Sequence, residues 1–402
     1  MPKERKKVKT AGIICEYNPI HGGHVFHIQE TRRLLGEDTA VVCVMSGNFV
    51  QRGEAAIFEK HARAEAAVRC GADLVVELPL PYALSSAERF AFGGVSILNA
   101  LGCVTHLSFG SEAGDLGPLR AVSACADAPE TLARMKEELK KGVSYPLSRA
   151  RAVRAVLGEH GGVLDTPNNV LGVEYLRALK ATRSEMEPVT VARRGARHDG
   201  HGAESASYIR KLFQSGGDPW ALIPEPAREV FRGEVARGRG PVLAGALEVA
   251  VLSRLRMLPP EAFASLPDAT EGLERRLMRA AQTCPDLESA AAQVKTKRYA
   301  HARIRRMLLC AALGVTAELN RLPPPYIRVL AVGQRGRAVL SRARETARLP
   351  IIVKPALARR LGGRALEYFK LEAAATDLYA LAFDGKARQG GLEWTTSPFV
   401  AE

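Results

Sequence analysis

Two histidines three residues apart are the strongest chemical signal in this sequence. His21 and His24 stand in the string EYNPIHGGH, residues 16–24. At the start of a helix, residues three apart project from the same side of the first turn. The free backbone N–H groups of that turn attract anions, and Gly23 lets a ligand approach the backbone closely. Imidazoles placed there donate hydrogen bonds to phosphate and stabilise charge on a leaving pyrophosphate, so the spacing predicts phosphate chemistry.

The elements that must position these histidines alternate between strand-like and helix-like patterns. Apolar runs of the β type cover residues 8–18, 39–47, 73–80 and 104–112, and helical segments separate them. This alternation is typical of βαβ units and predicts an α/β fold with a Rossmann-like parallel sheet. Ligands of such sheets bind at the carboxyl ends of the strands. The histidine string follows the first predicted strand, which is a suitable place for a site.

From about residue 215 the pattern changes. Residues 215–226, SGGDPWALIPEP, form a junction rich in Gly and Pro, and the segments beyond it are mostly helical with breaks at proline. A chain of 402 residues suits two or three domains. We therefore expect a catalytic α/β domain over residues 1–215 and a helical, basic domain over residues 216–402.

The charge of the chain favours a polyanionic partner. There are 57 Lys and Arg against 43 Asp and Glu, a net charge of +14. Residues 295–306, KTKRYAHARIRR, contain no acidic residue and open a predicted helix, where the helix dipole disfavours cations. That placement suits contact with RNA phosphates, and a solvated helix face is the alternative. The predicted RNA contacts are Lys295, Lys297, Arg298, Arg303, Arg305 and Arg306.

Composition excludes several classes of protein. Hydrophobic residues make up 47% and charged residues 25%, which suits a globular core. No apolar run approaches the roughly 20 residues of a membrane span, and the basic N-terminus leads into a strand rather than a signal peptide. Seven cysteines without a CxxC spacing argue against a disulfide framework and against zinc. We expect a cytoplasmic protein without a membrane partner or a metal site of its own.

Several strings together resemble one family. HxGH at residues 21–24 is similar to the signature of the nucleotidyltransferase superfamily, which joins the α-phosphate of ATP to an acceptor and releases pyrophosphate. The strings EYNPIHGGH, SGNFVQRGEAA, DLVVELP, FGSE and TPNNVLGVEYLRAL resemble the tRNA(Met) cytidine acetate ligases. The resemblance covers residues 10–215 through specific motifs and the helical half more loosely.

The resemblance implies a function and a set of site residues. It implies an HxGH-type ligase that activates acetate with ATP as acetyl-adenylate and then acetylates N4 of the wobble cytidine of elongator tRNA(Met). Mg²⁺ would accompany the ATP phosphates. His21 and His24 would be catalytic. The first ATP-binding segment would comprise Ile14, Cys15, Glu16, Tyr17, Asn18, Pro19, Ile20, His21, Gly22, Gly23, His24, Val25, Phe26 and His27. The other ATP-binding positions would be Gly110, either Asn168 or Asn169, Arg193 and Arg194.

Two further segments resemble functional strings but have plainer explanations. Residues 205–210, SASYIR, resemble the second phosphate motif of the superfamily, so Ser207 and Arg210 are expected at ATP. A simple serine cap on a helix is the alternative. Gln51 and Arg52 follow the second predicted strand and are candidates for the acetyl or cytidine pocket, where an ordinary βα loop is the alternative.

Other functions compete with the ligase. A small-molecule HxGH enzyme, such as a pantothenate-synthetase-like ligase or a cofactor adenylyltransferase, would not need a basic helical half. A tRNA-binding module with a decayed nucleotide site conflicts with the intact His21, Gly23 and His24. A class I aminoacyl-tRNA synthetase would carry a KMSKS-like string where residues 205–210 stand. The residues alone identify neither the acid, nor the tRNA, nor the oligomeric state.

Overall fold

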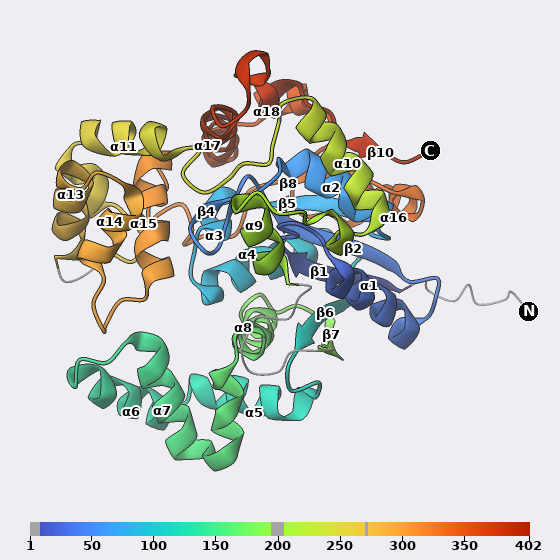
Figure 1. The fold of residues 1–402 in the computed structure, drawn as a ribbon. Helices are drawn as coiled ribbons and strands as arrows, with labels where there is room; N and C mark the ends of the chain where they lie inside the picture. Colours follow the sequence, from blue (N-terminus) through green and yellow to red (C-terminus); the bar gives the residue numbers. More distant parts are fainter. Residues whose placement is uncertain (1–8, 194–204, 270–271) are drawn as a thin grey trace, which may run out of the picture.

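The computed structural model describes residues 9–193, 205–269 and 272–402. Its centre is one sheet with the strand order β10-β8-β5-β2-β1-β6-β7, and β9 pairs with β8 at the side (Figure 1). A small antiparallel hairpin of β3 (Phe49–Val50) and β4 (Glu54–Ala55) follows β2. The five strands from the first half run parallel, as the sequence predicts: β1 (Thr10–Cys15), β2 (Ala40–Ser46), β5 (Leu74–Leu78), β6 (His106–Ser111) and β7 (Glu187–Ala192).

The strand order reverses next to β1. The chain moves outward from β1 to β2 and β5, and then returns to place β6 and β7 on the other side of β1. A crevice for ligands forms in doubly wound sheets at this kind of reversal, outside the carboxyl ends of the strands. The string at residues 16–24 leaves β1 at that point.

The second half of the chain also contributes strands, where its sequence pattern predicts mainly helices. β8 (Ile327–Val332) pairs antiparallel with β5, and both β9 (Ile351–Ile352) and β10 (Phe399–Val400) pair parallel with β8. These strands are short apolar runs beside prolines, which periodicity does not separate from helix breaks. The expected boundary near residue 215 stays a prediction, but the sheet itself is built from both sides of it.

Helices cover both faces of the sheet. Alternate residues of β2 enter two different cores, since Val42 and Val44 pack with α4 and α16 whereas Val41 and Cys43 pack with α2. In the first half the helices are α1 (Gly22–Leu35), α2 (Lys60–Arg69), α3 (Leu80–Ala83), α4 (Ala87–Ala100), α5 (Leu116–Ala126), α6 (Pro129–Lys140), α7 (Tyr145–Leu157), α8 (Pro167–Ala181) and α9 (Ala206–Gln214). In the second half they are α10 (Glu225–Ala236), α11 (Glu248–Met257), α12 (Pro260–Ala264), α13 (Leu273–Thr283), α14 (Leu287–Val294), α15 (His301–Leu313), α16 (Gln334–Thr346), α17 (Gly363–Ala380) and α18 (Leu392–Thr395).

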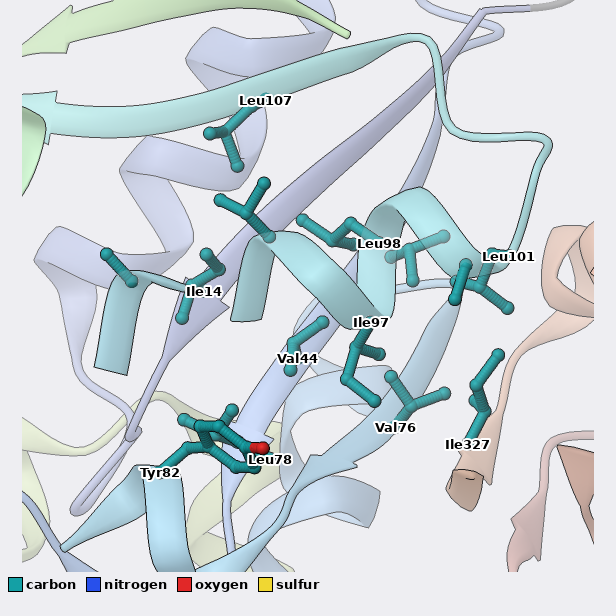
Figure 2. Packing of buried hydrophobic residues seen from close by; sticks show 14 of the residues in the cluster. Ile14, Val44, Val76, Leu78, Tyr82, Ile97, Leu98, Leu101, Leu107 and Ile327 are labelled. Carbon is teal, nitrogen blue, oxygen red and sulfur yellow. The ribbon is translucent and has the colours of Figure 1, made fainter. Parts of the chain in front are cut away.

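Close packing beneath β1 fixes the strand that leads into the histidine string. Figure 2 shows Ile14 of β1, Val44 of β2 and Leu98 of α4 in one apolar cluster. A Cβ at Gly12 would come within 2.5 Å of Leu98 Cδ1, so only glycine lets α4 lie this close to β1. The core therefore holds the end of β1 rigidly.

Two helical groups project from this core (Figure 1). Helices α11, α13, α14 and α15 surround a second apolar cluster that includes Val251, Leu277 and Ile304. Helices α5, α6 and α7 form a lobe between β6 and α8. No helix among residues 9–193, 205–269 and 272–402 is long and apolar enough to cross a membrane. The seven cysteines all lie in the described ranges and are unpaired.

Candidate active site

The two histidines of the HxGH string cap the first helix reciprocally. His21 is the N-cap of α1 in an extended conformation, and its Nδ1 accepts a hydrogen bond from the Gly23 N–H at 3.1 Å. Nδ1 of His24 accepts from the His21 N–H at 3.3 Å. This is the arrangement of a capping box, built here from imidazoles in place of a hydroxyl and a carboxylate. The ring centroids lie 3.9 Å apart, so the structure brings the two predicted catalytic residues together.

The cap fixes the tautomer of both rings. An imidazole whose Nδ1 accepts a hydrogen bond carries its proton on Nε2 when it is neutral. Burial, and then the Arg193 guanidinium, lowers the pKa of His21 to about 4. Burial also lowers the pKa of His24 well below its ordinary value, with His21 and Arg193 adding to the effect. At neutral pH the helix start therefore carries two Nε2–H donors without a fixed positive charge on either ring.

Gly23 packs closely against the His21 ring. A Cβ at position 23 would lie 3.0 Å from Cε1 and 3.2 Å from Nδ1 of His21. The sequence indicates a glycine that admits a ligand to the backbone. The structure adds that the glycine gives the capping imidazole room to lie over the turn.

A buried arginine holds the histidine loop, which comprises residues 16–21 between β1 and α1, against the loop that follows β2. Arg63 of α2 is fully buried, and its guanidinium donates to backbone carbonyls only: Phe58 at 2.9 Å, Ser46 at 3.0 Å, and also Glu16 and Gly47. Glu16 belongs to the loop after β1, whereas Ser46 and Gly47 end β2. Arg63 thus joins the two loops. Its sequence context is an ordinary helix, so no pattern marks it as part of the site.

Two side chains of the histidine loop make further contacts with the β3–β4 region. Glu16 Oε1 accepts from the Gln51 N–H at 2.7 Å, and Asn18 Oδ1 accepts from the Ile57 N–H at 2.8 Å. Burial raises the pKa of Glu16. Gln51, a candidate for the acetyl or cytidine pocket, therefore contacts the loop through its backbone. Nδ2 of Asn18 is buried without a hydrogen-bond partner.

A polar group at the ends of β6 and β7 faces the same crevice. Glu112 accepts from Nδ2 of Asn168 at 2.6 Å and from the Asn169 N–H at 2.9 Å. Arg193, directly after β7, donates from Nη1 to Oδ1 of Asn168 at 3.3 Å. Asn169 is buried, and its Oδ1 accepts from the Ala113 N–H at 3.1 Å. Asn168 thus lies beside the predicted phosphate-binding arginine, whereas Asn169 holds a turn.

Two other predicted residues, His27 and Gly110, have clear positions. His27 Nε2 lies 3.0 Å from Ser108 Oγ, which ties α1 to β6, and burial lowers its pKa to about 4. Gly110 ends β6 beside Arg193, where a Cβ would make only ordinary contact with that side chain at 3.5 Å. Arg194 lies outside the described residues.

In the second predicted phosphate motif, residues 205–210, Ser205 caps a helix and Arg210 reaches the histidine loop. Ser205 is the N-cap of α9, because its Oγ accepts from the Tyr208 N–H at 3.2 Å, which is the plain cap named above. Arg210 instead reaches the histidine loop, where its Nη1 donates to the Asn18 carbonyl at 2.7 Å. Ser207 and Arg210 both line a cavity next to this loop.

The basic segment differs from the predicted single helix start. α14 ends at Val294 and α15 begins at His301, so the lysines lie in a connection, and Lys295 and Lys297 are exposed. Arg298 donates to the Leu139 carbonyl at 3.5 Å, across to α6. Contact of these three residues with RNA stays a prediction.

The arginines of α15 have partners within the protein. Nη2 of Arg303 donates to the Asp268 carbonyl at 2.8 Å. Arg305 forms ion pairs with Glu54 at 2.7 Å and Glu288 at 2.6 Å, and Arg306 donates to the Gln51 carbonyl at 3.1 Å. The segment contains no acidic residue, yet the fold brings two from distant positions. Their part in RNA contact stays a prediction.

A buried ionic network lies behind the loop after β2. The Lys60 ammonium pairs with Glu77 at 2.7 Å and with Glu393 of α18. Asn48 accepts from the Lys60 N–H at 2.9 Å and donates to Thr376 Oγ1 of α17 at 3.2 Å. The C-terminal helices therefore support a loop of the first half directly.

Comparisons with known proteins identify the family of this chain. The family model described as HIGH Nucleotidyl Transferase matches residues 8–393. The tRNA(Met) cytidine acetate ligase of Acetivibrio thermocellus is 36% identical and covers 98% of this chain and 100% of its own length, and that of Syntrophomonas wolfei is 36% identical with shares of 96% and 98%.

Solved structures agree in fold as well. Thermotoga maritima TmcAL bound with alpha-thio ATP superposes with a TM-score of 0.89 at 34% identity, and covers 98% of this chain and 99% of its own. The apo form gives a TM-score of 0.90 at 33% identity, with the same two shares. Together with the HxGH capping box at the sheet reversal, these matches show that the chain belongs to the HIGH nucleotidyl transferases and, among them, to the tRNA(Met) cytidine acetate ligase family.

Proposed function

We propose that this protein activates acetate with ATP, forms acetyl-adenylate and pyrophosphate, and transfers the acetyl group to N4 of the wobble cytidine of elongator tRNA(Met). The observation that carries the adenylation chemistry is the pair of neutral Nε2–H donors of His21 and His24 at the start of α1. The identity of the acid and of the tRNA is supported by the names of the relatives.

The first step places negative charge where the site holds donors. A carboxylate oxygen of acetate attacks the α-phosphorus of ATP, a new P–O bond forms, and the bond to the bridging oxygen breaks with its electron pair on pyrophosphate. The histidine N–H donors and the α1 N-terminus stabilise the phosphate oxygens. Arg193 and Arg210, which flank the histidines, add charge-assisted hydrogen bonds.

The second step needs the cytidine amine beside the adenylate. N4 attacks the acetyl carbonyl carbon, a C–N bond forms, and the C–O bond to the phosphate breaks. The electron pair leaves with AMP, and the proton that N4 loses passes to the departing phosphate. The protein's task in this step is to bring an unstacked base to the ATP crevice.

Magnesium fits this site as a companion of ATP. The side chains gathered at the crevice are N–H donors and arginines, which suit anionic oxygens, while Glu112 already accepts hydrogen bonds from both asparagine residues. We therefore propose that Mg²⁺ enters on the ATP phosphates, where it neutralises their charge. We place the protein in the cytoplasm, where its tRNA substrate is.

Isotope exchange between ATP and pyrophosphate tests the first step. Exchange should require a short carboxylic acid, should be fastest with acetate in a panel from formate to butyrate, and should proceed without tRNA. Mass spectrometry of nucleosides from incubated tRNA should then find N4-acetylcytidine in elongator tRNA(Met) alone. Exchange that does not depend on a carboxylic acid would contradict the proposal.

A further inference from the structure

A cavity of about 570 Å³ lies next to the histidine loop and is separate from it. Its lining comes from the β3–β4 hairpin, from α9, from the connection between α10 and α11, and from α11, α14 and α15. Figure 1 shows β4 between α9 and the helical group that contains α15. None of His21, His24 and His27 is among the lining residues that the structure describes. The described lining of the cavity is therefore distinct from the histidine pair.

Arg210 connects the cavity with the histidine loop. Its side chain lines the cavity, and its Nη1 donates to the Asn18 carbonyl in the histidine loop at 2.7 Å. A group bound in the cavity is thus one guanidinium away from the loop that we assign to the phosphates. An acceptor of the acyl group must lie close to the adenylate, and this cavity is next to the loop that we assign to its phosphates.

We propose that this cavity receives the cytosine base of the tRNA substrate, turned out of the anticodon stack, and that the Glu54 carboxylate accepts a hydrogen bond from its N4 amine. This inference rests on the proposed function and names the place of its second substrate. A carboxylate that accepts from N4 is the usual protein partner of cytosine. Uracil carries a carbonyl at the same position and would be repelled.

The lining suits a flat, partly polar ring. Phe49, Val251 and Leu308 provide apolar surface, and Arg52 provides donors for the ring nitrogen and carbonyl on the acceptor side of the base. The volume lies within the range of about 300–1,000 Å³ that is typical of small-molecule sites. A nucleobase has apolar faces and a polar edge, whereas an aliphatic ligand has no polar edge. A nucleobase therefore fits a cavity in which carboxylate and guanidinium groups border an apolar surface.

Glu54 is held so that one oxygen stays available. Its Oε1 accepts from Arg305 Nη1 at 2.7 Å, while Oε2 lies 3.9 Å from Arg210 Nη2, beyond hydrogen-bond distance. Arg305 is itself fixed by Glu288 at 2.6 Å. A carboxylate has about four acceptor positions, so this pairing orients Glu54 without saturating it.

The backbone next to Glu54 touches α15 directly. Gly53 has φ +75°, and a Cβ there would come within 2.5 Å of the Arg306 backbone nitrogen. The hairpin and the start of α15 are therefore in contact at a position where no side chain fits between them. The helical half thus sets the distance between Glu54 and the opposite wall of the cavity.

Two variants test the cavity with one matched control. Ala244→Trp places an indole on an exposed lining residue, and Ala246→Trp places it on an exposed neighbour outside the cavity. Glu54→Gln keeps the shape but replaces one acceptor by a donor. Acetate-dependent pyrophosphate exchange without tRNA should stay within about twofold of the wild-type rate in all three. Formation of N4-acetylcytidine should fall about 10- to 100-fold in Ala244→Trp and Glu54→Gln, and stay unchanged in Ala246→Trp.

The outcomes separate this inference from the proposed function. If the wild-type protein lacks acetate-dependent exchange, the proposed function fails first. If exchange is normal and Ala244→Trp and Glu54→Gln acetylate tRNA at the wild-type rate, the cavity is not the base site. An equal loss in Ala246→Trp would also count against it. Equilibrium titration of the wild-type protein with CMP and UMP gives a check that needs no variant, since CMP should bind more tightly and equal affinities would overturn the proposal.

Discussion

Replacing His21 by alanine and by asparagine separates its two roles in the structure. Its Nδ1 caps α1 by accepting from the Gly23 N–H, and its Nε2–H is the donor that we assign to the leaving pyrophosphate. Alanine removes both groups. Asparagine is among the best N-cap residues and restores an acceptor for the helix, but it places no donor where imidazole Nε2 stands.

The two effects differ in size and in the quantity that reports them. Loss of an N-cap costs about 1 kcal/mol of folding free energy, with a range of about 0.5–2 kcal/mol. Loss of one preorganised donor to a developing anion lowers the rate about 10²- to 10³-fold, or about 3–4 kcal/mol of transition-state stabilisation. We therefore expect His21→Ala to lose both stability and rate, and His21→Asn to recover the stability while the rate stays low.

Denaturant unfolding and acetate-dependent pyrophosphate exchange measure the two quantities on the same samples. His24→Ala provides a comparison, because it removes the other Nε2–H and the acceptor of the His21 N–H. Wild-type exchange in His21→Asn would refute the reasoning, since the histidine would then act only as a cap. Full recovery of the rate together with the stability would have the same meaning.

The remaining predictions concern pH, RNA, the core and ATP. Burial and then Arg193 lower the folded-state pKa of His21 to about 4 from 6.5, so stability should decrease as the pH falls from about 6.5 towards 4, and His21→Asn should lessen the decrease in urea titrations. Lys295→Glu with Lys297→Glu should reduce the salt slope of tRNA binding by about two, measured by filter binding. Lys60→Met removes the ion-pair partner of the buried Glu77 carboxylate and should cost about 3–5 kcal/mol in denaturant unfolding. Arg193→Ala should weaken ATP binding by about 1.5–3 kcal/mol in calorimetry.

Controls for these predictions come from the same chain. Arg232→Glu with Arg237→Glu changes the charge equally on exposed positions at α10, which packs against α2, and should leave the salt slope unchanged. An unchanged slope in the lysine variant would assign that segment to a solvated surface. Stability that is flat between pH 6.5 and 4 would contradict the link to histidine burial.

The sequence predicts the residues that could carry the chemistry better than it predicts the residues that hold them in place. The HxGH string and the strand before it are local patterns, and they predict the first βα unit and the pairing of His21 with His24. The choice between Asn168 and Asn169 depends on which side chain turns toward Arg193, and adjacent residues of one helix start do not differ in pattern. The role of Arg63 could not be predicted from the sequence, because its hydrogen-bond partners are backbone carbonyls, which every residue type carries.

Long-range neighbours account for the rest. A segment without acidic residues indicates free cations, but Arg305 pairs with Glu288 of the preceding helix and with Glu54 from far along the chain. Likewise, the run that forms β8 is recognisable as a strand only beside the edge of β5. Both features arise from the way the second half folds back on the first, which composition and periodicity do not contain.

The joining of β8 and β10 to the sheet has a consequence for synthesis on the ribosome. The histidine string precedes β8 in the chain by about 300 residues, so β5 keeps an open edge until β8 is made, and Lys60 lacks the Glu393 carboxylate until residue 393 is made. An open strand edge and an unpaired buried ammonium both disfavour a finished core. We therefore expect the first half to complete its core only after the segments that form β8 and α18 have been synthesised and have folded back on it.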